Sequence, residues 1–179
     1  MERIVFSLDI NDNWNALIDT NVVFLDSTKH GTNRYGMKLA CFTTIDSNSK
    51  TQILAAALLI EETKDAYIWL MNAFSGFFSN PDVIFTDGDE QMINAIEEVF
   101  GKETIHLRCI WHIWKNFYQK FHSCFERDQW REVAKQFWTI AKTSDIRYCD
   151  SFEGEWHNMI EYMRQHASCD QKTVSRILM

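Results

Sequence analysis

The fold is decided by a short apolar run that ends on an acid, Asn21-Val22-Val23-Phe24-Leu25-Asp26. The run is rich in β-forming residues and has no helical period, which is typical of a buried strand. A second run of the same kind, Val83-Ile84-Phe85-Thr86, is followed directly by Asp87. The sequence therefore contains two predicted strands that each end on a carboxylate.

The residues between these two runs predict a hairpin and a helix. Residues 38–45 and 52–60 are apolar and are separated by a polar turn, although the Ala-rich second arm could also begin a helix. Apolar residues then recur at three- and four-residue steps over residues 66–77, and Pro81 breaks this pattern. This spacing predicts an amphipathic helix.

Further elements follow the second acid. Residues 92–100 predict a helix that closes at Gly101, residues 104–107 predict a fifth strand, and helical patterns continue through residues 111–141 and 152–165. This order predicts an α/β fold, a mixed sheet of five strands flanked by helices. The crossover rule leaves few ways to wind it, and in one of them the first and fourth strands are parallel neighbours. Asp26 and Asp87 then meet at the carboxyl ends of these strands, where such sheets place ligands.

Composition limits the classes of protein that fit. The chain has 179 residues, 46% of them hydrophobic, which suits one domain with one core. Its 18 basic and 25 acidic residues give a net charge of -7, which disfavours a module that grips nucleic acid by charge alone. The longest apolar run is too short to span a bilayer, and we expect residues 1–20 not to be a secretory signal, because Asp9 and Asp12 interrupt any apolar core. Five cysteines without a Cys-x-x-Cys pair predict no disulfide framework. We expect a cytosolic or nuclear protein with no membrane partner.

An acid placed directly after buried strand residues is costly unless something neutralises it. Each acid could simply start a turn or cap the next helix. The alternative is that the carboxylates converge around Mg²⁺ or Mn²⁺ for phosphoryl transfer, with a third acid supplied by a helix. Glu153, which opens the last predicted helix, is the candidate, and Glu155 competes with it. A Glu in a first helical turn also favours the helix dipole, so Glu153 has a structural explanation too.

Four stretches around these residues resemble the Mutator-like element (MULE) transposases, including the plant far-red-impaired-response regulators. The resemblance covers about residues 21–118 and extends thinly to Trp156. The stretches are Phe24 to Thr28 with Thr32 to Gly36, Ala57 to Leu59 with Glu62-Thr63 and Tyr67 to Leu70, Phe85 to Asp89 with Ala95-Ile96 and Val99-Phe100, and His106 to His112. Their joint order and spacing carry the resemblance.

The resemblance implies a ribonuclease-H-like transposase core over residues 21–165. Residues 1–20 would lead into this core, a helical insertion would occupy about residues 111–143, and residues 166–179 would form a truncated tail. It implies a DDE-type enzyme that uses Mg²⁺ or Mn²⁺ to cleave DNA and join the freed end to target DNA. The catalytic and metal-binding acids would be Asp26, Asp87 and Glu153. The partners would be transposon ends and target DNA, with a homo-oligomer in the active state and a location in the nucleus.

Four more residues match family positions that would place DNA near the acids: Asn33, Arg34, Cys109 and His112. Cys109 and His112 form the family's Cys-x-x-His signature. On a helix this pair could supply two zinc ligands, but His106 and Cys124 have a spacing that fits no common finger. Packing of a small thiol and a bonded imidazole is the simpler explanation.

Two departures from the family pattern lead us to expect a fragment or a degenerate copy. The loop after Asp26 is one residue longer than the pattern, and residues 1–179 are not expected to include the DNA-binding and zinc modules that flank this core in the family. A domesticated, non-catalytic, DNA-associated transcription regulator is the alternative function. A third alternative, a nucleotide-binding or partner-binding α/β domain, lacks any Gly-x-Gly-x-x-Gly or Walker loop.

Overall fold

The structure, a computed structural model, describes residues 4–7, 21–27, 33–142 and 149–168. The chain divides into two compact units, residues 1–109 and residues 110–179. Each unit has its own hydrophobic core, whereas the sequence predicted one core. The physical reason is that the second unit's helices carry enough large aromatic side chains to bury one another. Each unit is described by itself.

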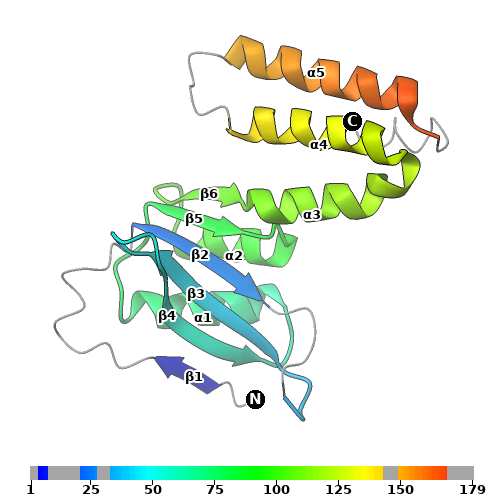
Figure 1. Ribbon diagram of the computed structural model, residues 1–179. Coiled ribbons are helices and arrows are strands. Elements are labelled where there is room, and N and C mark those ends of the chain that lie inside the picture. Colours follow the sequence, from blue (N-terminus) through cyan, green and yellow to red (C-terminus); the bar gives the residue numbers. More distant parts are fainter. Residues whose placement is uncertain (1–3, 8–20, 28–32, 143–148, 169–179) are drawn as a thin grey trace. The chain divides into compact units, whose positions relative to one another are not determined.

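The first unit contains a six-stranded sheet and two helices (Figure 1). The strands are β1 (Ile4–Ser7), β2 (Val22–Ser27), β3 (Lys38–Ile45), β4 (Thr51–Leu59), β5 (Val83–Thr86) and β6 (Ile105–Arg108). The helices are α1 (Lys64–Ser75) and α2 (Glu90–Val99). The five strands expected from the sequence are all present, and the second arm of the hairpin is a strand, which settles the alternative left open above.

The strands lie in the order β1-β4-β3-β2-β5-β6. β1, β4, β3 and β2 pair antiparallel, whereas β2 with β5 and β5 with β6 pair parallel. This confirms the ribonuclease-H-like mixed sheet and the parallel pairing of the first and fourth predicted strands. The additional edge strand β1 was not expected, because Ile4-Val5-Phe6 is too short a run to stand out in a sequence; its Ile4 aligns with Leu58 of β4.

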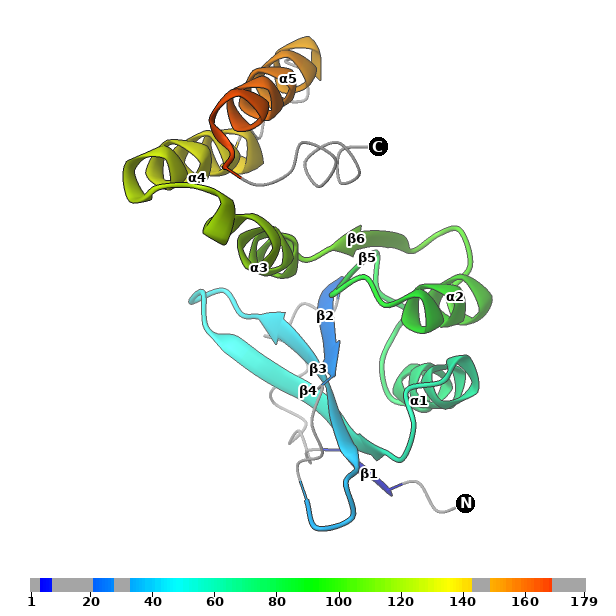
Figure 2. The same ribbon diagram turned by 90° about the vertical axis from the view of Figure 1, so that its right-hand side faces the viewer.

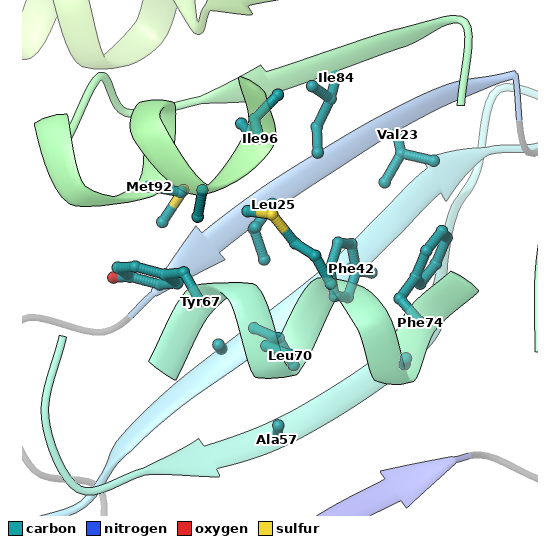
Figure 3. Close-up of a cluster of buried hydrophobic side chains, with 14 of the residues drawn as sticks. Val23, Leu25, Phe42, Ala57, Tyr67, Leu70, Phe74, Ile84, Met92 and Ile96 are labelled. Carbon is teal, nitrogen blue, oxygen red and sulfur yellow. The ribbon is translucent and has the colours of Figure 1, made fainter. Parts of the chain in front are cut away.

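The core of the first unit lies between the sheet and its two helices. Both helices cover the same face of the sheet, as Figure 2 shows. Alternate strand residues point into this layer, including Val23 and Leu25 of β2 and Phe42 of β3 (Figure 3). Thr63 caps α1 by accepting a hydrogen bond from the Ala66 N–H, a typical helix start.

The second unit consists of α3 (Ile110–Phe121), a short 3-10 helix (His122–Cys124), α4 (Arg127–Lys142) and α5 (Cys149–His166). Its core joins aliphatic residues such as Val133 and Met159 to a cluster of rings. α5 begins earlier than the sequence predicted, so Glu153 lies in its second turn rather than its first. None of the helices in the described part of the chain has the length and apolar character needed to cross a lipid bilayer.

Candidate functional site

The two strand-end acids are brought to the same edge of the sheet. β2 and β5 pair in parallel with Val22 opposite Val83, Val23 opposite Ile84 and Phe24 opposite Phe85. Continuing this register by two residues aligns Asp26 with Asp87. Neighbouring strands in a sheet are about 4.8 Å apart. The continued register therefore places Asp26, in β2, beside Asp87, the residue that directly follows β5.

The face of the sheet on which Asp26 lies follows from the residues before it. Val23 and Leu25 belong to the buried core beneath α1 and α2. Side chains alternate along a strand, so Phe24 and Asp26 lie on the opposite face. The rings of Phe24 and Phe85 stack there with centroids 4.9 Å apart. Two residues after each of these rings come the acids, of which Asp26 is exposed and Asp87 is half-buried.

Asp26 is followed by a residue with well-defined partners. The Ser27 hydroxyl donates to Glu62 Oε1 at 2.5 Å and lies 3.3 Å from the Tyr67 hydroxyl. Lys38 Nζ lies 3.8 Å from the other oxygen of Glu62. This network ties the end of β2 to the start of β3 and to the segment before α1.

Two neighbouring groups remain protonated near neutral pH. Burial raises the pKa of the Cys41 thiol, and the charge of Asp26, its partner across the strands, raises it further. Burial likewise raises the pKa of the Tyr67 hydroxyl well above its usual value, although the hydrogen bond with Ser27 acts against this. The negative charges of Glu62, Asp89 and Asp87 add to the rise. Acids from the segment before α1 and from the turn after β5 thus act on the same buried hydroxyl at this end of the sheet.

The two acids in the turn after β5, Asp87 and Asp89, accept different hydrogen bonds. Asp89 is the cap of α2, because its Oδ1 accepts hydrogen bonds from the N–H groups of Gln91 and Met92. Asp87 is not the cap; its Oδ1 accepts only the nearby Asp89 N–H, at 3.1 Å, among the hydrogen bonds described here. Of the two structural explanations given above, helix capping therefore applies to Asp89, whereas Asp87 starts the turn by accepting the Asp89 N–H.

The third predicted acid, Glu153, belongs to the second unit. It is exposed on α5, as is Glu155. Glu155 lines a cavity of about 410 Å³ between α4 and α5, together with Asn158 and Tyr162. Two residues along a helix correspond to a rotation of about 200°, so the two acids point to different sides of α5. A single site can use one of them only.

Two of the four residues expected to position DNA, Asn33 and Arg34, lie in the turn before β3. Asn33 shapes a tight turn, because its side-chain oxygen accepts the Tyr35 N–H at 2.9 Å and the Met37 N–H at 3.3 Å. The guanidinium of Arg34 is exposed and lies 4.7 Å from the centre of the Tyr35 ring. The loop between Ser27 and this turn, expected to be one residue longer than the family pattern, falls on residues 28–32 and lies outside the described residues.

The Cys-x-x-His signature spans the end of the sheet and the start of a helix. Cys109 precedes α3 and its N–H donates to the backbone oxygen of Thr86 at 2.7 Å, so the two residues do not share the helix that the zinc alternative assumed. His112 is half-buried on α3. In the part of the chain that is described, no three His, Cys, Asp or Glu side chains are arranged to hold a metal ion. The zinc alternative gains no support.

The donor chemistry at the strand ends nevertheless suits a hard divalent cation. Asp26, in β2, and Asp87, directly after the neighbouring strand β5, offer carboxylate oxygens, which Mg²⁺ and Mn²⁺ prefer. Two such ligands are typical of Mg²⁺ sites, where water and substrate phosphate complete the coordination. The pair therefore fits part of a divalent site, and a third acid would have to come from elsewhere.

Sequence reasoning missed the residues that support both acids. Ser27, Glu62 and Tyr67 lie around the end of β2, and Thr86 with His106 lies beside the end of β5. The available signal was a hydroxyl residue directly adjacent to each acid, Ser27 after Asp26 and Thr86 before Asp87. The partners of these hydroxyls come from other elements, which the local sequence does not identify.

The strand order and directions define a ribonuclease-H-like domain. The MULE transposase domain family matches residues 22–116, more than half of the chain. The chain belongs to this family, as the four sequence stretches indicated.

Curated relatives come from Arabidopsis thaliana. Protein FAR1-RELATED SEQUENCE 5 is 33% identical over 109 residues, which cover 56% of this chain and 14% of the relative. Protein FAR-RED IMPAIRED RESPONSE 1 is 25% identical over 159 residues, which cover 75% of this chain and 19% of the relative. The chain therefore spans less than a fifth of the length of these two relatives.

Two solved structures also resemble the chain. The HTLV-2 integrase catalytic core domain in complex with magnesium is 10% identical, with a TM-score of 0.35 over 83% of this chain and 86% of the other. A chain of the simian T-cell lymphotropic virus intasome in complex with PP2A regulatory subunit B56 gamma is 16% identical, with a TM-score of 0.38 over 52% of this chain and 35% of the other. The fold itself is assigned from the strand order and register.

Proposed function

We propose that this chain is the catalytic core of a DDE-type transposase that cleaves DNA strands and transfers them in the presence of Mg²⁺ or Mn²⁺. The observation that carries the proposal is the parallel register of β2 and β5, whose continuation by two residues aligns Asp26 with Asp87, the residue directly after β5. Membership of the MULE transposase domain family supports it. Residues 21–165, including a helical insertion at about 111–143, would make up this core.

Asp26, Asp87 and Glu153 would hold the metal ions. Two neighbouring carboxylates repel each other and gain from a shared cation. A bound Mg²⁺ or Mn²⁺ would activate the attacking oxygen and stabilise the leaving oxygen of a phosphoryl transfer. Asp26 lies in β2 and Asp87 directly follows β5, so little ordering would be required when the cation and DNA bind.

Contact with DNA would involve the exposed Arg34 and the family positions Asn33, Cys109 and His112. An acidic chain with a net charge of -7 gains little from phosphate contacts alone. We therefore infer that most DNA affinity comes from other parts of a longer protein or from further copies in a homo-oligomer. Action on transposon ends and target DNA would take place in the nucleus.

A second function is a domesticated regulator that keeps the fold and associates with DNA without cutting it. The observation in its favour is that the curated relatives described above bear far-red-impaired-response names. Both functions are compatible with the presence of all three acids, so the acids alone do not distinguish them.

Titration of Mn²⁺ into the purified chain by calorimetry tests the metal site. We expect binding by the unaltered chain and at least tenfold weaker binding by Asp26→Asn and by Asp87→Asn, because each removes a charged ligand. Asp82→Asn is the matched control, since Asp82 is an exposed acid at the opposite end of β5. Absence of binding by the unaltered chain, or equal binding by all variants, would refute the shared site.

A nicking assay on supercoiled plasmid in Mg²⁺ then separates the two functions. Nicks made by the unaltered chain and not by Asp26→Asn support the transposase. Metal binding without nicks favours the regulator. Glu153→Gln and Glu155→Gln form a matched pair, and we expect only Glu153→Gln to weaken Mn²⁺ binding.

A further inference from the structure

Thr86, the last residue of β5, is a buried hydroxyl with two partners beside the candidate site. Its side chain is 1% exposed. Its Oγ1 accepts the Gly88 N–H at 3.1 Å and lies 2.8 Å from Nε2 of His106 on the neighbouring strand β6. A buried polar group that keeps all its partners is rigid, because losing any of them leaves an unsatisfied group.

The Thr86–His106 hydrogen bond can run in either direction. Thr86 Oγ1 accepts the Gly88 N–H and still has one proton to donate and a second lone pair, so the roles depend on the imidazole tautomer. Burial, followed by the nearby positive charge of Arg108, lowers the pKa of His106, although the charge of Glu97 acts against this. In either direction the bond ties Thr86 to β6.

The turn that follows is held in a conformation that only glycine adopts readily. Gly88 has φ of +92°. A Cβ at this position would come within 3.2 Å of Cδ and Nε of Arg108. One residue further on, Asp89 is fixed to α2 as its cap. Asp87 thus lies between Thr86, which is bound to β6, and Asp89, which is bound to α2.

We propose that Thr86 and His106 are positioning residues for Asp87, whose carboxylate they keep aligned with Asp26 through the hydrogen bonds to the turn. This inference rests on the proposed function, in which Asp87 binds a divalent cation. The two carboxylates repel each other before a cation binds, which would push a loose turn away from β2. A turn anchored on β6 resists this displacement, so the site needs less ordering when the cation arrives.

Two pairs of variants of the full chain, each titrated with Mn²⁺ by calorimetry, test this role. Thr86→Val keeps the size of the side chain but removes the hydroxyl, and we expect a dissociation constant about tenfold higher or more, as is usual for groups that orient metal ligands. Thr86→Ser keeps the hydroxyl and should restore affinity to within about twofold of the unaltered chain. His106→Leu should resemble Thr86→Val, whereas His106→Gln, whose side-chain amide can accept or donate the same bond, should recover part of the affinity.

Thr104→Val separates positioning from general loss of stability. Thr104 is also buried, and its hydroxyl donates to the Pro81 backbone oxygen at 2.7 Å, at the other end of β5 and β6. We expect Thr104→Val to lower the melting temperature about as much as Thr86→Val does and to leave Mn²⁺ affinity unchanged. A second readout is amide hydrogen exchange at Gly88, which should accelerate in Thr86→Val but not in Thr104→Val.

The outcomes distinguish the inference from the function on which it rests. If the unaltered chain binds Mn²⁺ and Thr86→Val binds it equally well, the positioning role is refuted and the proposed function stands. If Thr104→Val weakens binding as much as Thr86→Val does, the effect is one of stability and the role is again refuted. If the unaltered chain binds no Mn²⁺, the proposed function fails, and the ligand role of Asp87 fails with it.

Discussion

The hydrophobic cores of the two units contain different kinds of side chain. Among the described residues, the buried hydroxyl side chains all lie in the first unit: Thr44, Tyr67, Thr86 and Thr104. The interior of the second unit is built around rings, with Trp114 contacting Phe117, Trp130, Phe137 and Trp138 at centroid distances of 4.9–5.9 Å. The first core contains buried hydroxyl groups whose hydrogen bonds fix particular strands and turns. The second core consists mainly of packed aromatic rings.

This contrast indicates where precise positioning is built into the protein. A hydrogen bond between buried groups sets direction and distance, and losing one partner is costly. Stacked and tilted rings stabilise a helix bundle but tolerate small shifts. The candidate acids Asp26 and Asp87 lie next to the hydroxyl-bearing core, as expected for a site that requires fixed geometry.

The largest effect is expected for Phe42→Ala, which tests whether the two cores are independent. The Phe42 side chain is fully buried, and its ring lies 4.3 Å from that of Phe74. Its removal should lower the free energy of unfolding of the first unit by about 3–5 kcal/mol. Hydrogen exchange by mass spectrometry should show faster exchange in peptides from residues 21–109 and not in those from residues 110–168.

The control for this measurement is Ile45→Ala, in the same strand but half exposed to solvent. It should change exchange very little. Faster exchange throughout the chain in Phe42→Ala would mean that the two cores unfold as one, and the comparison drawn above would then fail.

A smaller effect is expected for Phe137→Leu in the second unit. Leucine fills much of the same space but loses the ring contacts with Trp114 and Phe117, at 4.9 and 5.3 Å. We expect a loss of about 1–2 kcal/mol in urea unfolding followed by tryptophan fluorescence. Phe152→Leu, at an exposed ring on α5, should be close to neutral. An equally small loss at Phe137 would show that ring geometry contributes nothing beyond volume.

The smallest effect at neutral pH is expected for Tyr67→Phe, but this variant should change the response to alkali. The Tyr67 hydroxyl makes only long contacts, 3.3 Å to Ser27 and 3.4 Å to Glu62, so its loss should cost no more than about 1 kcal/mol near pH 7. Burial raises the pKa of Tyr67 in the folded chain, whereas the unfolded chain releases this proton near pH 10. Stability should therefore fall as pH rises above about 10, by roughly 1.4 kcal/mol per pH unit, and this part of the fall should be absent in Tyr67→Phe.

Urea midpoints measured between pH 8 and pH 11 provide the test. Tyr118→Phe, at an exposed tyrosine of α3, should follow the unaltered chain. If Tyr67→Phe also follows the unaltered chain above pH 10, a group other than Tyr67 causes the alkaline loss of stability.

Local patterns predicted five of the six strands and both helices of the first unit. The acid-terminated runs at Asp26 and Asp87, together with the hairpin between residues 38 and 60, left the parallel pairing of β2 with β5 as one of a few windings, and the structure has that pairing. β1 escaped prediction because its stability depends on pairing with β4, far along the chain. The start of α5 was misplaced because its first turn carries no apolar periodicity.

The surroundings of the site were less accessible to sequence reasoning. Which hydroxyl bonds which partner depends on contacts between strands, as with Thr86 and His106, or between a strand and a loop, as with Ser27 and Glu62. The roles assigned to Asp26, Asp87 and Glu153 remain predictions. The position of Glu153 in the second turn of α5, however, removes the helix-dipole explanation for it.

The parallel pairing of β2 with β5 also bears on the order in which the chain folds. The β3–β4 hairpin closes a short loop, whereas β2 can reach β5 only across a long one that contains the hairpin and α1. Closing long loops has a greater entropic cost, so contacts of this kind form late. We expect Asp26 and Asp87 to meet only when the rest of the sheet can hold them against their repulsion. A partly synthesised or partly folded chain would then lack the acid pair, and the candidate site would form only in the finished domain.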